Sequence, residues 1–339
     1  MGDLTFQNFV EFLTKRKDEI VSSMVIDRRS EAYGFFSKYF KKYYSETSGG
    51  NKYTRSVAAA DSSEFVRELY NGRKIILSRG YSIFEASTYS SFFSEVTWVA
   101  RDDLRPLTTM IMEDCEHRSM LDLLDHEKPE IILIDGSLTG RLMHGNMEFR
   151  ADRLEGFKQT YYSNLKALLE KARESEAILV FLSKSSESHS LVSKIIRDSD
   201  QRNEAGSNMK RVVDHVLIKS LAHAPGYSIP VDFPSSNLEI NGSIWTFHLL
   251  PALNDLPLKI DFISSSMKSY DNAVLERIVD TIFWAYSGQK VYNIWLSKVD
   301  SMVKFRSEEV EKIYMQQFEK TIGIPMYETR GERRARIRI

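Results

Sequence analysis

The sequence has a single cysteine, no long apolar run and almost no net charge. Cys115 alone excludes an intramolecular disulfide and a cysteine-based zinc site, and it fits a cytoplasmic protein. No stretch approaches the roughly 20 apolar residues that span a bilayer, so we expect no membrane segment. The first residues lack a basic segment followed by an apolar one, so we expect no signal peptide. A formal net charge of −1 excludes a global attraction to nucleic acid, so such binding would need local patches.

The 339 residues are enough to bury a large core. Apolar side chains at helical spacing within residues 4–44 predict an N-terminal helical arm over 1–50. Residues 51–325 alternate apolar strands with amphipathic helices and predict one large domain. Residues 326–339 form a basic tail, which we expect to contact phosphate, acidic protein or nothing.

The order of elements predicts an α/β fold with a mixed sheet flanked by helices and a helical C-terminal region. We expect strands at 57–61, 74–77, 81–89, 96–99, 131–135, 178–182, 245–250 and 258–262. We expect helices at 110–124, 153–173, 272–286 and 299–318. Several strands precede the first of these helices, and one strand follows it. This order indicates a sheet whose early strands are antiparallel and whose later strand is joined by a parallel crossover.

Lysines alternate with aromatic residues over residues 38–44. Such segments can grip single-stranded nucleic acid. An amphipathic helix with its aromatic side chains turned inward gives the same pattern, and we favour that interpretation.

An acid ends the apolar run Ile131-Ile-Leu-Ile-Asp135, and a Gly-Ser turn follows it. A carboxylate at the end of a buried strand is rigidly held yet reachable, as in the sites of open α/β sheets. The alternative is an Asx turn that only ends the strand. A weaker copy upstream runs from Val57 through three alanines to Asp61. Two such acids suggest a carboxylate pair that holds a divalent metal.

A metal site for phosphodiester hydrolysis needs further oxygen ligands, and two metals roughly 4 Å apart can activate water and stabilise the leaving oxygen. Glu113 and Glu116 lie on the helix predicted between the two acids. Their i, i+3 spacing places both near one helix face. Either could turn toward the strand ends, or both could be solvated.

These residues resemble the NurA family, archaeal nucleases that process DNA ends and have an RNase H-like core. The family pattern has an acid after the first strand, an acid on a helix and a strand end of the form Leu-x-Asp-Gly-Ser-Leu. These fall on Asp61, on Glu116 with Glu113 as the alternative, and on Ile134-Asp135-Gly-Ser-Leu138. The resemblance covers roughly residues 55–318.

Later family features are only partly present. A strand ending in Ser-Lys matches Ser183-Lys184. A tyrosine falls on Tyr292, but the histidine expected eight residues later is Asp300. Asn293 occupies the position of the family's usual proline after the tyrosine. Ser62 occupies the position of the usual glycine after the first acid.

The resemblance implies a metal-dependent DNA nuclease that uses two Mn²⁺ or Mg²⁺ ions, digests DNA 5′ to 3′ and cuts single strands. It further implies a homodimer, docking on a HerA-type hexameric ATPase, and a role in DNA end resection and repair. Asp61, Glu116 and Asp135 would be catalytic metal ligands, with Tyr292 catalytic and Asp300 a substitute ligand. Lys184 and Lys298 are candidates to contact DNA phosphate.

Two other functions compete with this one. The changes at Ser62 and Asp300 favour a paralogue that kept the fold and the ATPase contact but lost cutting. A haloacid-dehalogenase-type phosphatase also has an apolar strand that ends in Asp, but it needs a second Asp where Ser137 stands. Six histidines show no metal-ligand spacing, and we assign them no role: His117, His144, His189, His215, His223 and His248.

Overall fold

The computed structural model describes residues 4–24, 26–47, 56–184, 187–199, 207–233, 243–264 and 269–324. The predicted basic tail lies outside these ranges. Contacts divide the chain into two compact units. The first comprises residues 1–53, 182–234 and 243–290, and the second comprises 54–181, 235–242 and 291–339. No described helix has the length and apolar character needed to cross a membrane.

The second unit is built on five strands in the order β4-β3-β2-β5-β6. The strands are β2 (Val57–Glu68), β3 (Lys74–Phe84), β4 (Ser87–Thr97), β5 (Ile131–Asp135) and β6 (Ile178–Ser183). β2, β3 and β4 pair antiparallel, whereas β5 runs parallel to β2. The sheet has antiparallel and parallel pairs, so the predicted mixed sheet is confirmed.

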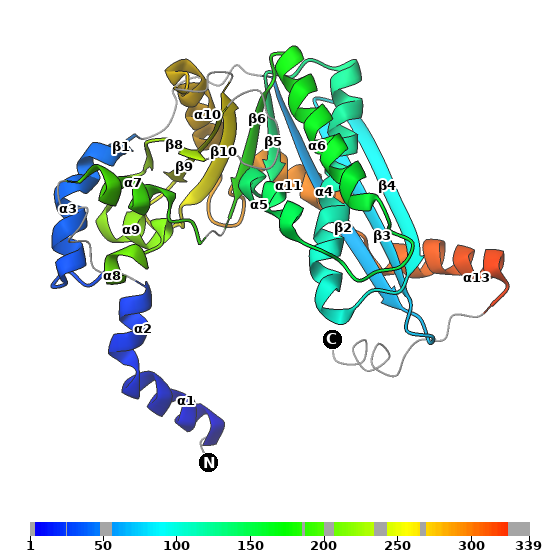
Figure 1. Ribbon diagram of the computed structural model, residues 1–339, viewed down its shortest axis with the longest axis horizontal. Coiled ribbons are helices and arrows are strands. Elements are labelled where there is room, and N and C mark those ends of the chain that lie inside the picture. Colours follow the sequence, from blue (N-terminus) through cyan, green and yellow to red (C-terminus); the bar gives the residue numbers. More distant parts are fainter. Residues whose placement is uncertain are drawn as a thin grey trace. The chain divides into compact units, whose positions relative to one another are not determined.

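Helices cover both faces of this sheet (Figure 1). They are α4 (Arg101–His126), α5 (Leu138–Met143), α6 (Phe157–Glu174), α11 (Ile294–Val303), α12 (Ser307–Glu309) and α13 (Gln316–Ile322), with a 3-10 turn at His144–Asn146 and a π-helical turn at Val310–Met315. Successive side chains of a strand point to opposite faces. Ile76 packs with Leu107 and Ile111 of α4, while its neighbour Ile75 packs with Val310 on the other face.

Gly80 is where α4 meets the sheet most closely. A Cβ atom at Gly80 would lie 2.4 Å from the backbone carbon of Cys115 and 2.7 Å from the nitrogen of Glu116. Only glycine therefore allows this turn of α4 to lie directly on β3. Gly80 is paired with Ser62 across the sheet, so the same contact brings Glu116 next to β2.

The first unit holds strands in the order β1-β7-β9-β10, and β8 also pairs with β9. These are β1 (Tyr44–Glu46), β7 (Gly226–Ser228), β8 (Val231–Phe233), β9 (Ser243–Leu250) and β10 (Leu258–Ser264). The antiparallel pairing of β9 with β10 confirms the predicted strand pair. The helices are α1 (Leu4–Lys15), α2 (Lys17–Met24), α3 (Glu31–Tyr43), α7 (Ser190–Asp198), α8 (Ser207–Lys210), α9 (Asp214–Leu221) and α10 (Asn272–Ala285).

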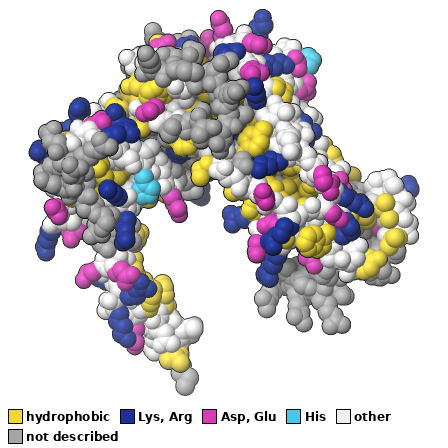
Figure 2. All heavy atoms as spheres, in the orientation of Figure 1, with side chains coloured by type: hydrophobic (Ala, Val, Ile, Leu, Met, Phe, Trp, Pro, Cys, Tyr) yellow, Lys and Arg dark blue, Asp and Glu magenta, His cyan; other side chains and the backbone are white. Residues whose placement is uncertain are grey.

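The N-terminal segment is helical, as predicted, but only α3 packs into a core. Phe36 and Phe40 of α3 lie in a cluster with residues of α7 and α9. α1 has no buried residue, and its apolar side chains are exposed, as Figure 2 shows along this arm. Contacts therefore group residues 1–53 with 182–234 and 243–290, while the predicted domains 1–50, 51–325 and 326–339 stay a prediction.

Two predicted elements are wrong. The predicted strand 81–89 contains a tight turn, because β3 ends at Phe84 and β4 begins at Ser87; Glu85 adopts a φ of 51° there. The predicted helix 299–318 is two segments. α11 begins at Ile294 and ends at Val303, and a new helical turn begins at Ser307.

Gly80→Ala should destabilise the second unit, because the new methyl group meets the backbone of α4 rather than a side chain that can rotate. Overpacking of this kind costs about 3 kcal/mol, which corresponds to a loss of roughly 6 °C in melting temperature for a chain of this size. Differential scanning fluorimetry measures it. Gly34→Ala is the control, since a Cβ there has nothing within 4 Å and alanine favours the helix. Equal melting temperatures for the two variants would disprove the close packing.

Candidate active site

The two predicted acids lie where β5 ends beside β2. The pairing of β2 with β5 stops at Ala60 and Ile134, one residue before each acid. β2 itself continues for seven residues beyond Asp61, to Glu68. Asp61 is buried and Asp135 is half-buried. Among the described residues, no strand therefore pairs with this side of β2 beyond Ala60.

Neighbouring residues of β2 assign Asp61 to one face of the sheet. Ser62 donates a hydrogen bond to Oε1 of Glu116 on α4, at 2.5 Å. The Ser63 hydroxyl instead accepts from the backbone nitrogen of Phe305, just after α11, at 3.2 Å. Because side chains alternate along a strand, Asp61 faces the side of α11. Glu116 reaches the same point from the opposite face.

Negative charge accumulates around Asp61. Burial and the charges of Glu116, Asp135 and Asp300 raise the pKa of Asp61 to about 8. One backbone hydrogen bond, from the nitrogen of Ser62 at 2.7 Å, acts in the opposite direction. Like charges raise carboxyl pKa values because each disfavours ionisation of the others. These four carboxylates therefore interact although they come from four elements.

Glu116 is fully engaged by neighbouring groups. Its Oε2 forms an ion pair with Arg141, and its Oε1 accepts the hydrogen bond from Ser62. Burial raises the pKa of Glu116 to about 7, against the lowering effects of Arg141 and Ser62. Of the two glutamates considered from the sequence, Glu116 is the one that lies beside Asp61.

Glu113 belongs to a different set of contacts. It accepts a hydrogen bond from the Tyr161 hydroxyl at 2.6 Å and lies 3.2 Å from Nε2 of His144. Burial would raise the pKa of Glu113, but the charges of Arg141 and His144 and these hydrogen bonds lower it. Glu113 therefore supports Tyr161 and His144.

Tyr292 lies next to Asp135. Its hydroxyl donates to Oδ2 of Asp135 at 3.4 Å, a long hydrogen bond. Burial and the charges of Asp135 and Asp61 raise the pKa of Tyr292 far above its ordinary value, so the phenol remains a donor. The next residue, Asn293, caps α11 by accepting from the backbone nitrogens of Trp295 and Leu296, both at 3.1 Å.

Asp300 lies within α11, so it cannot cap the start of that helix. Its Oδ2 is 2.6 Å from Nζ of Lys304, and the hydrogen bond and charge of Asp300 raise the pKa of Lys304. The charge of Asp300 also contributes to the raised pKa values of Asp61 and Tyr292. Lys298 is exposed on the same helix, and Lys184 is exposed at the residue after β6, in the first unit. Contact of either lysine with DNA stays a prediction.

The donor chemistry of this site fits a hard divalent cation. Asp61, Glu116 and Asp135 offer carboxylate oxygens, which Mg²⁺ and Mn²⁺ prefer, and a cation would relieve the repulsion among them. No three His, Cys, Asp or Glu side chains of the described residues already have the arrangement of a metal centre. A cation held by all three acids would therefore need their side chains to rotate toward one another.

The sequence matches the NurA domain over residues 55–305. The chain belongs to the NurA family. A search of curated proteins gives no match. The match confirms the resemblance noted from the sequence, and with it membership of a nuclease family.

Solved structures of the family share the fold of this chain. The NurA nuclease from Sulfolobus solfataricus is 15% identical, with a TM-score of 0.64 over 94% of this chain and 97% of that one. A structure of NurA bound to dAMP and manganese is 14% identical, with a TM-score of 0.59 over 88% and 95%. A structure of NurA with manganese is 11% identical, with a TM-score of 0.56 over 93% and 98%.

Sequence reasoning missed three residues that touch this site. Arg141 pairs with Glu116, His117 contacts Arg141, and Lys304 pairs with Asp300. The one available signal was Arg141, a lone cation in the apolar segment Leu138-Thr-Gly-Arg-Leu-Met143 that follows the Asp-Gly-Ser turn. The two other residues have no distinguishing local pattern.

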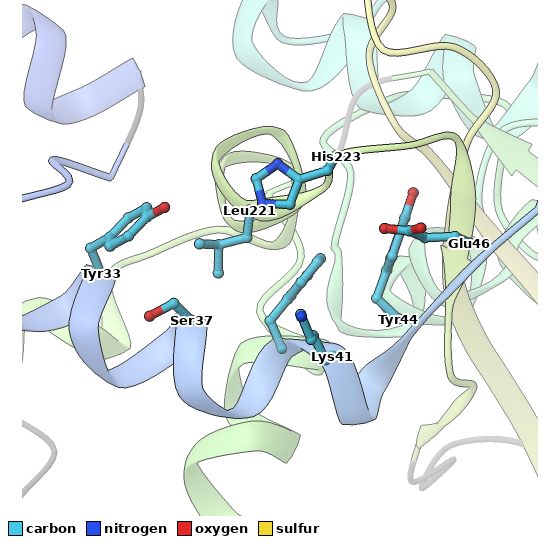
Figure 3. Close-up of a pocket in the computed structure, with 8 residues that line it drawn as sticks. Tyr33, Ser37, Lys41, Tyr44, Glu46, Leu221 and His223 are labelled. Carbon is cyan, nitrogen blue, oxygen red and sulfur yellow. The ribbon is translucent and has the colours of Figure 1, made fainter.

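The basic and aromatic segment 38–44 has its rings turned inward, as expected for an amphipathic helix. Phe40, Tyr43 and Tyr44 are buried, and Phe40 stacks on Tyr44 at 5.0 Å. A surface pocket of about 500 Å³ lies beside it (Figure 3). Its lining combines Tyr44 and Lys41 with His223, which follows the end of α9. These buried rings offer no stacking surface for bases.

Glu116→Ala should abolish activity, whereas Glu113→Ala should lower stability with a smaller loss of activity. Only Glu116 contributes to the charge around Asp61, while Glu113 supports Tyr161 and His144. Cleavage rates and melting temperatures of both variants measure the difference. Equal and mild losses of cleavage in the two variants would place the third acid elsewhere.

Proposed function

We propose that this protein is a metal-dependent DNA nuclease whose site is formed by Asp61, Glu116 and Asp135. The observation that carries the proposal is the placement of these acids in a chain of the NurA family: Asp61 and Asp135 follow the last paired residues of β2 and β5, and Glu116 is bonded to the residue after Asp61. Structures of NurA with manganese, and with dAMP and manganese, support a divalent cation and a DNA substrate.

Asp61 and Asp135 would hold Mn²⁺ or Mg²⁺ from the face of α11, and Glu116 from the face of α4. A bound divalent ion supplies a water of lowered pKa and neutralises charge on the phosphate; two ions can serve both reacting oxygens. Tyr292 keeps its proton and donates it to Asp135, so it would orient that carboxylate. Lys184 and Lys298 would each neutralise one phosphate charge.

The family resemblance supports finer proposals about the biological role. They comprise 5′ to 3′ exonuclease and single-strand endonuclease activity, DNA end resection and repair with a HerA-type ATPase, homodimer formation and a cytoplasmic location. Each stays a prediction.

A paralogue that binds the ATPase without cutting is the second candidate. Ser62, at the family's glycine position, donates directly to Glu116, and Arg141 takes the other oxygen of the same carboxylate. The Ser62 contact occupies one oxygen of Glu116 that a cation could otherwise bind. The same three acids are nevertheless retained, and we therefore place the nuclease first.

The purified protein should cleave labelled DNA with Mn²⁺ and should lose all cleavage in excess EDTA. Asp61→Ala and Asp135→Ala should each reduce cleavage by several orders of magnitude, because the reaction needs the cation. Without metal, their melting temperatures should equal or exceed that of the wild type, because removal of a carboxylate relieves repulsion.

Retention of cleavage in EDTA would contradict a metal-dependent mechanism. No cleavage with any divalent metal would favour the non-cutting paralogue. Normal cleavage by either aspartate variant would remove that residue from the site.

Asp300→Asn should weaken the apparent affinity for Mn²⁺ if Asp300 replaces the family histidine as a ligand, since an amide binds a hard cation less well than a carboxylate. Asp300→His should preserve or raise activity. A titration of cleavage against Mn²⁺ measures both effects. Loss of the exposed Asp300–Lys304 pair alone should change stability by less than about 1 kcal/mol. Identical midpoints for wild type and Asp300→Asn would exclude the ligand role.

A further inference from the structure

Arg141 is the buried cation next to the proposed site, with 1% of its surface exposed. It lies on α5, six residues after Asp135. Its guanidinium forms an ion pair with Glu116 and donates to the backbone oxygen of Asp135 at 3.0 Å. It therefore touches two of the three residues that would hold the cation.

The turn after β5 is what brings Arg141 back to Asp135. Gly136 adopts a φ of 104°, a region that favours glycine. Ser137 then caps α5 by accepting from the backbone nitrogen of Gly140 at 3.1 Å. This path directs α5 so that Nη2 of Arg141 reaches both Asp135 and Glu116.

Arg141 and Ser62 together fix both carboxylate oxygens of Glu116. Nη2 of Arg141 binds Oε2, and the Ser62 hydroxyl binds Oε1. One nitrogen thus connects the side chain of Glu116 on α4 to the backbone of Asp135 on β5. Since α4 and β5 are separate elements, this contact sets where Glu116 lies relative to the end of the strand.

Further contacts hold the guanidinium itself in place. Nη1 donates to Nε2 of His117 at 2.8 Å, Nε lies 4.0 Å from Oε1 of Glu113, and the group lies over the ring of Phe181 at 5.4 Å. Glu113 balances the positive charge of Arg141. With both glutamates ionised, these three charges sum to −1, which leaves Glu116 attractive to a cation.

We propose that Arg141 is the positioning residue for Glu116 in cation binding, and that it acts by tying this carboxylate to the backbone of Asp135. The inference rests on the proposed function, because it takes Glu116 to be a ligand. Metal ligands commonly need such partners, and their loss lowers metal affinity by about 10- to 100-fold. The competing role for Arg141 is a buried structural ion pair with no effect on the cation.

Isothermal titration of the full chain with Mn²⁺ alone tests the proposal, using Arg141→Met, Glu116→Gln and the double variant. Each single variant should weaken the affinity for Mn²⁺ at least about tenfold. The double variant should be no more than about threefold weaker than either single variant, because both changes remove the same positioned ligand.

Arg67→Met is the matched control. Arg67 is a buried arginine of the same unit that pairs with Glu311 and touches none of the three acids. It should lower the melting temperature and leave the affinity for Mn²⁺ unchanged. Arg141→Lys keeps the charge but lacks the fork that spans two partners, so its affinity should lie between those of wild type and Arg141→Met.

Wild-type affinity in a folded Arg141→Met protein would overturn the proposal and leave the metal site standing. If that variant does not fold, wild-type affinity in Arg141→Lys would overturn it equally. A loss of Mn²⁺ affinity in the double variant equal to the product of the two single losses would also contradict the proposal. An absence of Mn²⁺ binding by the wild type would instead overturn the proposed function, and the role of Arg141 with it.

Discussion

Repulsion among carboxylates at the end of β5 is the constraint around which this site is arranged. Asp61 is buried near Glu116, Asp135 and Asp300, and its burial together with these charges raises its pKa. Hydrogen bonds from Ser62 and Tyr292 and the ion pair with Arg141 offset part of it. Such a cluster lowers the stability of the folded protein when no cation is bound. This is common in sites that bind a cation.

The fold produces this cluster through two local features. β5 is short, so β2 extends past it and Asp61 is left beside an open edge. Gly80 lets α4 approach β3 until Glu116 meets Ser62. The length of β5 and the glycine in β3 therefore matter as much to the site as the acids themselves.

The sequence predicted the strand 131–135 and both aspartates because an apolar run that ends in Asp-Gly-Ser is a local pattern. It placed the start of α4 nine residues too late, since Pro106 interrupts the helical pattern. It also missed the turn at Glu85, which has no glycine, proline or asparagine. These errors arise where tertiary packing overrides local preference.

The site itself was less accessible to sequence reasoning. Helical spacing could not choose between Glu113 and Glu116, because the choice depends on Arg141, Tyr161 and His144, which are distant in the sequence. Asp300 was assigned by its distance in the sequence from Tyr292; Tyr292 lies just before α11, and Asp300 lies within it. The capping role of Asn293 became visible only once the true start of α11 was known.

The central claim is that Asp61, Glu116 and Asp135 together hold a divalent cation. Crystals grown with Mn²⁺ and measured at the manganese absorption edge test it most directly, because the anomalous signal locates the ion without reference to activity. We expect an anomalous peak at the end of β5, within bonding distance of oxygens from all three side chains. Ordered crystals at saturating Mn²⁺ with no peak there, or with peaks only at other carboxylates, would contradict the account.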